Sequence, residues 1–302
     1  MNSQRRNTMK RMDSNFRSRG LKCSGSLYLP NKASKPPVVI MAHGFGYAKD
    51  CGLQPYAEYF ANKGMAAFVF DYRHLGKSEG KPRNLVNPWR QLHDWEAAID
   101  HVRNLSEVDG TRIAIWGTSF AGGHVLVTAA KAKGIKAVVS QVPFVDGIAT
   151  CLGFPISYLA SGFIHGMMDF CCFLTGRDPH VVPTVGKPGK FAVMNTPESF
   201  PGYMGLIPPG FKFDNKTPAR IGLIIGVYRP TMYARRIKCP VLFVYGKKDS
   251  LCPCKAIERA AAKVPDSELF GLNVGHFDMY TGDLLKKVVE KEANFLLQNL
   301  TK

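Results

Sequence analysis

The chain has 302 residues, of which 45% are hydrophobic and 21% are charged. This is the composition of a globular protein with a sizeable core, and it excludes wholesale disorder. The formal net charge of +17 would suit an anionic partner. No nucleic-acid-reading module accompanies the scattered cations, so we expect a solvated basic surface and no nucleic-acid partner.

The N-terminus concentrates positive charge, with seven Lys or Arg residues and a single acidic one, Asp13, in residues 1–22. No apolar segment follows these cations, so they do not form a secretory signal. We expect residues 1–14 to be a basic, disordered tail, with a mitochondrial presequence or a weak contact with anionic membranes as alternatives. Eight cysteines at irregular spacing predict reduced thiols and a cytoplasmic protein.

The first half of the chain alternates strand-like and helix-like patterns. Runs of apolar and β-branched residues predict buried strands at residues 24–30, 37–42, 66–71, 112–116 and 137–139. Apolar residues at helical spacing predict helices at residues 53–62, 95–105 and 122–133. Such alternation with long connections predicts an α/β fold built on a mostly parallel, doubly wound sheet.

The alternation stops after Pro143 and resumes with strands at residues 241–245 and near Leu269, followed by an amphipathic final helix. We therefore assign residues 15–145 and 236–302 to the core and residues 146–235 to a lid inserted before the last two strands. The lid begins with 22 residues, 147–168, that contain no Asp, Glu, Lys or Arg. A proline and four glycines argue against a membrane span there, so we expect an apolar lid.

The second part of the insertion carries eight prolines between residues 179 and 218. Proline cannot donate a ladder hydrogen bond and interrupts helices. We therefore expect irregular chain lying over the core, without a sheet of its own.

The strand at residues 112–116 runs into Gly117-Thr118-Ser119-Phe120-Ala121-Gly122-Gly123 and then a helix. A serine at so tight a strand-to-helix turn is held in a strained conformation that projects its hydroxyl above the sheet, and it needs small neighbours. A phosphate-binding glycine turn is the alternative, but neither a Gly-x-x-x-x-Gly-Lys nor a dinucleotide-binding spacing is present. We predict Ser119 as a nucleophile.

An activated serine needs a base and an acid that orients the base, and in this topology they follow in the order Ser, acid, His. His276 is the single histidine downstream of the strand at residues 241–245, and Asp249 comes just past the carboxyl end of that strand. Active-site groups of open α/β sheets gather at such ends. Asp146 is the rival acid, and Asp278 is expected to help begin the final helix.

A tetrahedral intermediate needs two N–H donors for its oxyanion. We expect one from the amide of Phe120, at the start of the helix after Ser119. The second is expected from Phe45 in the loop His43-Gly44-Phe45-Gly46, where the glycines allow a sharp turn. His43 has no place in the Ser, acid, His order and is expected to brace this loop.

Other patterns carry weaker predictions. Apolar residues of the lid, Phe154, Tyr158, Phe163 and Met167, are candidates to line an acyl pocket, although such a stripe is more often simply core. Cys239, Cys252 and Cys254 lack the ligand pairs and the fourth ligand of a zinc site. We therefore expect no zinc site there.

Motifs spread over residues 16–300 together resemble those of the α/β-hydrolase superfamily. They are His43-Gly44-Phe45-Gly46, Asp71-Tyr72-Arg73-x-x-Gly76-x-Ser78-x-Gly80, the turn around Ser119, Asp249, and Gly275-His276-Phe277. Within the superfamily, the sequence is similar to dienelactone-hydrolase and acetyl-xylan-esterase-like enzymes and to the fungal polyketide transferase/thioesterase group, and distantly to prolyl dipeptidyl peptidases. The resemblance implies acyl transfer through a covalent acyl-serine, normally to water, without a metal and without an organic cofactor. Ala121 departs from the usual second glycine.

The sequence therefore predicts a serine hydrolase that cleaves a small-molecule ester or thioester, with Ser119, His276 and Asp249 as its catalytic residues. The apolar lid favours a hydrophobic acyl group. One alternative is transfer of the acyl group to an acceptor other than water, as in a polyketide transferase. Another is a ligand-binding protein without activity on the same fold. The sequence predicts neither the natural substrate nor an oligomeric state.

Overall fold

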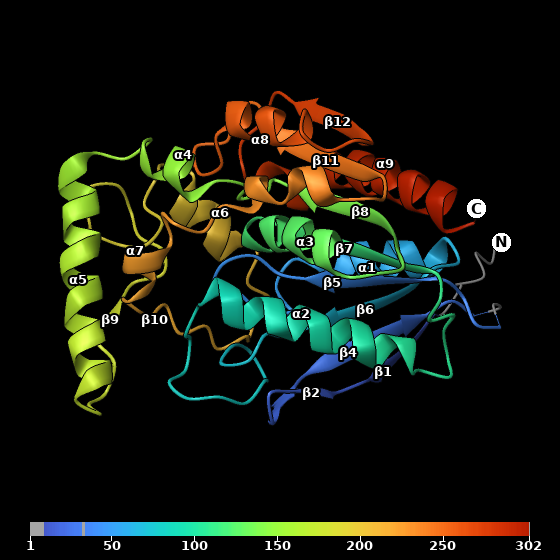
Figure 1. Ribbon diagram of the computed structural model, residues 1–302, viewed down its shortest axis with the longest axis horizontal. Helices are drawn as coiled ribbons and strands as arrows, with labels where there is room; N and C mark the ends of the chain where they lie inside the picture. Colours follow the sequence, from blue (N-terminus) through green and yellow to red (C-terminus); the bar gives the residue numbers. More distant parts are fainter. Residues whose placement is uncertain (1–8, 32–33, 302) are drawn as a thin grey trace, which may run out of the picture.

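The structure, a computed structural model that describes residues 9–31 and 34–301, is organised around an eight-stranded sheet (Figure 1). Strands β6, β5, β7, β8, β11 and β12 lie side by side in parallel, and β4 and β1 extend the sheet antiparallel at the β6 edge. In sheet order the strands are β1 (Lys10–Asp13), β4 (Gly25–Leu29), β6 (Ala66–Phe70), β5 (Val38–Ala42), β7 (Ile113–Thr118), β8 (Ile135–Gln141), β11 (Val241–Gly246) and β12 (Ser267–Leu272). The predicted mostly parallel sheet is confirmed.

Helices cover both faces of the sheet (Figure 1). Helices α1 (Gln54–Asn62) and α9 (Gly282–Leu300) contact each other on one face, and α2 (Pro88–Arg103) and α3 (Phe120–Lys131) contact each other on the opposite face. Helix α8 (Cys254–Ala261) packs against β11 and β12. Its buried face consists largely of alanine, which explains why apolar spacing did not predict it.

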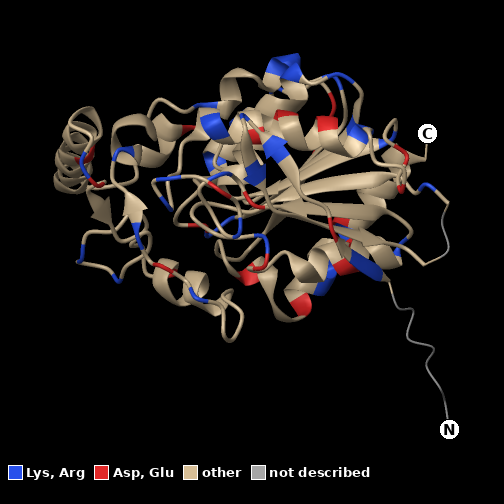
Figure 2. Cartoon of the chain, turned by 90° about the horizontal axis from the view of Figure 1, so that it is seen from below, with Lys and Arg blue, Asp and Glu red and all other residues tan. Residues whose placement is uncertain are grey.

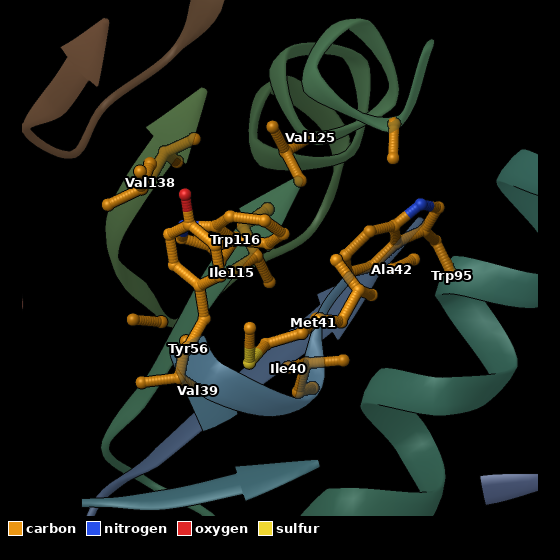
Figure 3. Packing of buried hydrophobic residues seen from close by; sticks show 14 of the residues in the cluster. Val39, Ile40, Met41, Ala42, Tyr56, Trp95, Ile115, Trp116, Val125 and Val138 are labelled. Carbon is orange, nitrogen blue, oxygen red and sulfur yellow. The ribbon is translucent and has the colours of Figure 1, made fainter. Parts of the chain in front are cut away.

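Strand β5 illustrates the core, because all five of its residues are buried. Alternate side chains point to opposite faces: Val39 and Met41 lie toward Tyr56 of α1, whereas Ile40 and Ala42 lie toward Trp95 of α2 (Figure 3). Covering both faces with helices demands a continuous apolar run, and this is why such runs predicted the central strands.

The basic N-terminus is ordered where it is described, and this corrects the expectation of a disordered tail at Lys10–Asp13. Strand β1 pairs antiparallel with β4, Arg11 forms an ion pair with Asp50 at 3.1 Å, and its guanidinium lies over the Tyr28 ring. A hairpin of β2 (Phe16–Ser18) and β3 (Leu21–Cys23) follows. These partners are distant in sequence, so local composition does not reveal them. Residues 1–8, and the membrane contact or presequence considered for them, lie outside the described residues.

The insertion between β8 and β11 lies at one end of the molecule, at the left in Figure 1. It contains α4 (Gly147–Cys151), α5 (Ile156–Leu174), β9 (Val181–Val182), α6 (Ser199–Gly205), β10 (Thr217–Pro218), α7 (Ile221–Ile224), η1 (Pro230–Met232) and η2 (Ala234–Arg236). Strands β9 and β10 pair antiparallel, so the expectation of no sheet in the proline-rich part is wrong in this detail. Pro218 occupies an edge position, where proline is tolerated.

Among the described helices, none is long and apolar enough to span a membrane. Lys and Arg residues are spread over helices and loops of the core and of the insertion rather than gathered in one stripe (Figure 2).

Candidate active site

The loops that carry the predicted residues meet at one edge of the sheet. The last residue of β5, Ala42, pairs with Gly117 in β7, and Gly246 at the end of β11 pairs with Leu272 at the end of β12. The chain leaves β5 for β6 on one side and leaves β7 for β8 on the other. Ligands of open α/β sheets bind where the strand order reverses in this way, outside the carboxyl ends of the strands.

Ser119 sits between β7 and α3 in the left-handed region, with φ 57° and ψ −118°. A side chain on Gly117 would place its Cβ 2.3 Å from the carbonyl oxygen of Ala121, so the turn closes only with glycine there. Ala121 itself is fully buried in the first turn of α3. A β-carbon-bearing residue at positive φ costs about 1–3 kcal/mol and persists where the surroundings enforce it, as at functional sites.

The side chains of Ser119, His276 and Asp249 form a hydrogen-bonded chain. His276 Nε2 lies 3.0 Å from Ser119 Oγ, and His276 Nδ1 lies 2.6 Å from Asp249 Oδ2. Asp249 Oδ1 accepts hydrogen bonds from the amides of Leu251 and Cys252, each at 2.8 Å, which hold the carboxyl group in place. Because the Asp249 carboxylate can only accept a hydrogen bond, His276 Nδ1 carries the proton and donates it. His276 Nε2 is then free to accept the proton of the serine hydroxyl.

The surroundings of His276 favour its charged form. Burial by itself lowers the pKa of the imidazole, but the carboxylates of Asp249 and Glu198 outweigh it and raise the pKa above the ordinary 6.5. A base that gains a proton from Ser119 is therefore stabilised as the imidazolium.

The two expected oxyanion donors flank Ser119. Phe120 is the first residue of α3, so its N–H has no acceptor within the helix. The rings of Phe45 and Phe120 meet edge to face with centroids 5.5 Å apart, which brings the loop after β5 against the start of α3. Tyr203 Oη donates to the Phe45 carbonyl at 3.0 Å and fixes this loop from the insertion. Phe45, Phe120 and Ser119 line one cavity.

Of the four lid residues expected in the pocket, two lie at Ser119. Phe154 and Tyr158 line the cavity of about 120 Å³ that reaches Ser119. Phe163 lies in a neighbouring cavity of about 280 Å³ beneath α5, which shares Tyr158 with the first. Met167 instead lines a groove on α5 together with Phe163 and is 39% exposed, so the structure does not bring it to the serine.

The remaining residues considered from sequence have other partners. The Asp146 carboxylate caps α4 and pairs with Arg229 at 2.9 Å, so this rival acid is engaged away from His276. Asp278 accepts from the Gly275 amide at 2.8 Å, and α9 begins only at Gly282, so its expected role in starting that helix is wrong. His43 is buried, and burial lowers its pKa to about 4, which keeps it neutral.

One residue of the site has no signal in the sequence. Glu198, from the proline-rich part of the insertion, accepts a hydrogen bond from the His276 amide at 2.7 Å.

Among the described residues, the group that could hold a metal ion is Asp249, Cys252 and His276, whose ligand atoms lie within 4.8 Å of one another. Burial raises the pKa of the Cys252 thiol well above its ordinary value, which disfavours the thiolate that binds metals. A site without metal or cofactor stays a prediction.

Comparisons with known proteins agree with this architecture. Residues 20–154 match the family model of the X-Pro dipeptidyl-peptidase (S15 family). The chain is 40% identical to the quorum-quenching protein AidA of Acinetobacter baumannii, over 94% of each chain. It is 25% identical to thiohydrolase apmlB of Arthrinium phaeospermum, over 93% of this chain and 94% of the relative.

A third relative has a solved structure. Polyketide transferase grgF of Penicillium sp. is 24% identical over 97% of this chain and 98% of the relative. The crystal structure of the alpha/beta hydrolase GrgF from Penicillium sp. has a TM-score of 0.82 to this chain at 23% identity, covering 97% of this chain and all of that one. The resemblance drawn from the motifs is therefore confirmed, and the chain belongs to the α/β-hydrolase superfamily.

Proposed function

We propose that the protein cleaves a carboxylic ester or thioester through an acyl-serine intermediate. The observation that carries the proposal is the hydrogen-bonded chain from Asp249 through His276 to Ser119, with the serine at positive φ above the sheet. Hydrolase names among the relatives support the reaction class, and the name of thiohydrolase apmlB supports thioesters among the substrates.

In the proposed reaction, Ser119 Oγ attacks the substrate carbonyl while His276 Nε2 takes the hydroxyl proton. Asp249 stabilises the imidazolium, and the amides of Phe45 and Phe120 donate to the oxyanion. The tetrahedral intermediate collapses as the leaving alcohol or thiol receives the proton from His276. Water, deprotonated by His276, then attacks the acyl-serine and releases the acid and the free serine.

The cavities support a hydrophobic acyl group. The cavity at Ser119 is lined mainly by apolar side chains, including Phe144, Phe154 and Leu159, and the second cavity continues beneath α5. Burial of an apolar chain contributes about 0.8 kcal/mol per methylene. In this proposal residues 146–235 act as a lid over the core of residues 15–145 and 236–302, and the lid selects the acyl group.

Transfer of the acyl group to an acceptor other than water is the second candidate, supported by the name of polyketide transferase grgF. Hydrolysis and transfer share every step up to the acyl-serine and differ in whether water reaches it. Incubation with a thioester and an added amine or alcohol separates them. Acid as the main product supports hydrolysis, and amide or ester as the main product supports transfer.

The test of the nucleophile is labelling of the purified protein with a fluorophosphonate probe, mapped by peptide mass spectrometry. We expect the label on Ser119, its loss in Ser119→Ala, and its retention in Ser106→Ala, a change at an exposed serine in the loop before β7. Folded wild-type protein that takes no label, or takes it equally in Ser119→Ala, would contradict an activated Ser119.

A further inference from the structure

Glu198 of the insertion bridges the two loops that carry the proposed acid and base. Its Oε1 accepts from the Ser250 amide at 2.8 Å and from the Ser250 hydroxyl at 2.6 Å. Its Oε2 accepts from the His276 amide at 2.7 Å. Ser250 directly follows Asp249, so a single carboxylate ties the residue after the acid to the base itself.

The surrounding chain is built to hold this carboxylate. A Cβ on Gly275 would lie 2.3 Å from Glu198 Oε2, so the loop that carries the base approaches the carboxylate as closely as only glycine allows. Thr196 Oγ1 lies 2.8 Å from Ser250 Oγ and 2.7 Å from the buried Ser199 Oγ. These contacts fix the start of α6 to the loop after β11.

The opposite end of α6 reaches the third loop. Tyr203 donates to the Phe45 carbonyl, and its ring stacks on Tyr47 with centroids 3.8 Å apart. Tyr47 Oη in turn donates to the Tyr203 carbonyl at 2.6 Å. Helix α6 and the residue before it thus contact the loops that carry the oxyanion donor, the acid and the base.

Several charged and titratable groups face His276. Asp249 binds Nδ1, Ser119 binds Nε2, the Glu198 carboxylate binds the main-chain amide, and Cys252 and Asp278 lie on the adjoining loops. Of these, the carboxylates of Asp249 and Glu198 act to raise the pKa of His276. Glu198 therefore supplies a second negative charge near the imidazolium, from outside the core.

We propose that Glu198 is a positioning residue of the active site. It holds the loops of Asp249 and His276 in fixed positions relative to each other, and it stabilises the positive charge that His276 gains during the reaction. This inference rests on the proposed function. It makes the insertion part of the catalytic framework as well as a lid, because the contact comes from a segment that the core fold does not supply.

The test compares wild type, Glu198→Gln and a matched control, Glu258→Gln. Glu258 accepts from Tyr245 Oη at 2.9 Å and does not contact His276, so the control makes the same chemical change elsewhere. The measurement is the second-order rate constant of Ser119 labelling by a fluorophosphonate from pH 5 to 9, on the full chain. Thermal unfolding of each variant shows that it is folded.

An amide at position 198 can accept from one loop but presents a donor to the other. We therefore expect Glu198→Gln to label about tenfold more slowly at the pH plateau, as befits one unpaired amide. Loss of the charge lowers the pKa of His276, so the pH at which labelling is half-maximal shifts to a lower value. The control is expected to match wild type in both quantities.

The outcomes separate the two proposals. Wild type that does not label at Ser119 contradicts the proposed function. Wild type that labels, with Glu198→Gln showing the same plateau rate and the same pH midpoint, overturns the role of Glu198 alone. A slower plateau with an unchanged midpoint also overturns it, because a purely structural effect lowers the rate without changing the pKa of the imidazole. An equal shift of the midpoint in the control overturns it too, because the shift would then not depend on position 198.

Discussion

The central sheet and helix α5 differ in where their apolar side chains lie. Every residue of β5 and β11 is buried, whereas α5 buries only Gly166 and Asp169 of its 19 residues. Phe163 of α5 is 58% exposed. Both segments are apolar in sequence, so an apolar run predicts burial only where other elements cover it on both sides. Figure 1 shows helices on both faces of the sheet, with α5 at the outer edge of the insertion.

The largest expected effect tests this difference directly, with the same substitution in each region. Phe243 in β11 is fully buried, so Phe243→Ala should lower the free energy of unfolding by about 3–5 kcal/mol. Phe163→Ala in α5 should lower it by less than about 1 kcal/mol, because most of its ring is already in water. Urea denaturation followed by circular dichroism measures both. Equal losses in the two variants would mean that α5 is covered in solution.

The core also contains an ionisable residue, Glu292, among its apolar side chains. Glu292 of α9 is fully buried and accepts from Trp116 Nε1 at 2.9 Å, and burial raises its pKa to about 8. Because the unfolded chain releases this proton near pH 4.5, the folded protein binds more protons than the unfolded chain between these values. The stability contribution is therefore full below about pH 4.5 and is lost as the pH rises through about 8.

The corresponding prediction concerns the slope of stability against pH. Between pH 5 and 8 the free energy of unfolding of the wild type should fall by up to about 4 kcal/mol from this residue. Glu292→Gln keeps an acceptor for Trp116 and cannot ionise, so its stability should depend less on pH. Denaturation at pH 5, 6.5 and 8 checks the difference. Parallel curves for the two proteins would show that Glu292 titrates near its ordinary value.

Sequence predicted the core and the candidate triad for one physical reason. Ser119, Asp249 and His276 each follow a strand, and buried parallel strands are visible as continuous apolar runs, so the fold itself brings the three loops to one edge. The signals at these positions are local: small residues around Ser119 and a loop with glycine before His276.

What sequence missed depends on contacts between distant segments. Glu198 lies in a proline-rich stretch without periodicity, and its role follows from meeting Ser250 and His276, 52 and 78 residues away. Strand β1 exists because β4 offers it a free edge, and α8 buries mostly alanine. Met167 and Phe163 have the same apolar character as Phe154, and only the three-dimensional path of α5 separates the residues at the serine from those on the outside.

The smallest expected effect sharpens that last distinction within the lid. Tyr158 lines both the cavity at Ser119 and the cavity beneath α5, so Tyr158→Ala should join the two spaces. We expect the ratio of kcat/KM for a dodecanoyl over a butanoyl p-nitrophenyl ester to rise about tenfold, the gain of roughly two further buried methylenes. Met167→Ala, on the outer groove, should change this ratio less than about twofold.

A matched variant isolates the ring from its hydroxyl. The Tyr158 hydroxyl donates to the carbonyl of Ala192 and lies 3.0 Å from the carbonyl of Val193, and Tyr158→Phe removes both contacts while keeping the ring between the cavities. Tyr158→Phe should therefore keep the wild-type ratio. A ratio that rises in Tyr158→Phe as well would assign the effect to movement of the segment around Val193. Preference for acetyl over longer esters by an order of magnitude in the wild type would contradict a hydrophobic acyl site and, with it, the part that the inner face of the insertion plays in choosing the substrate.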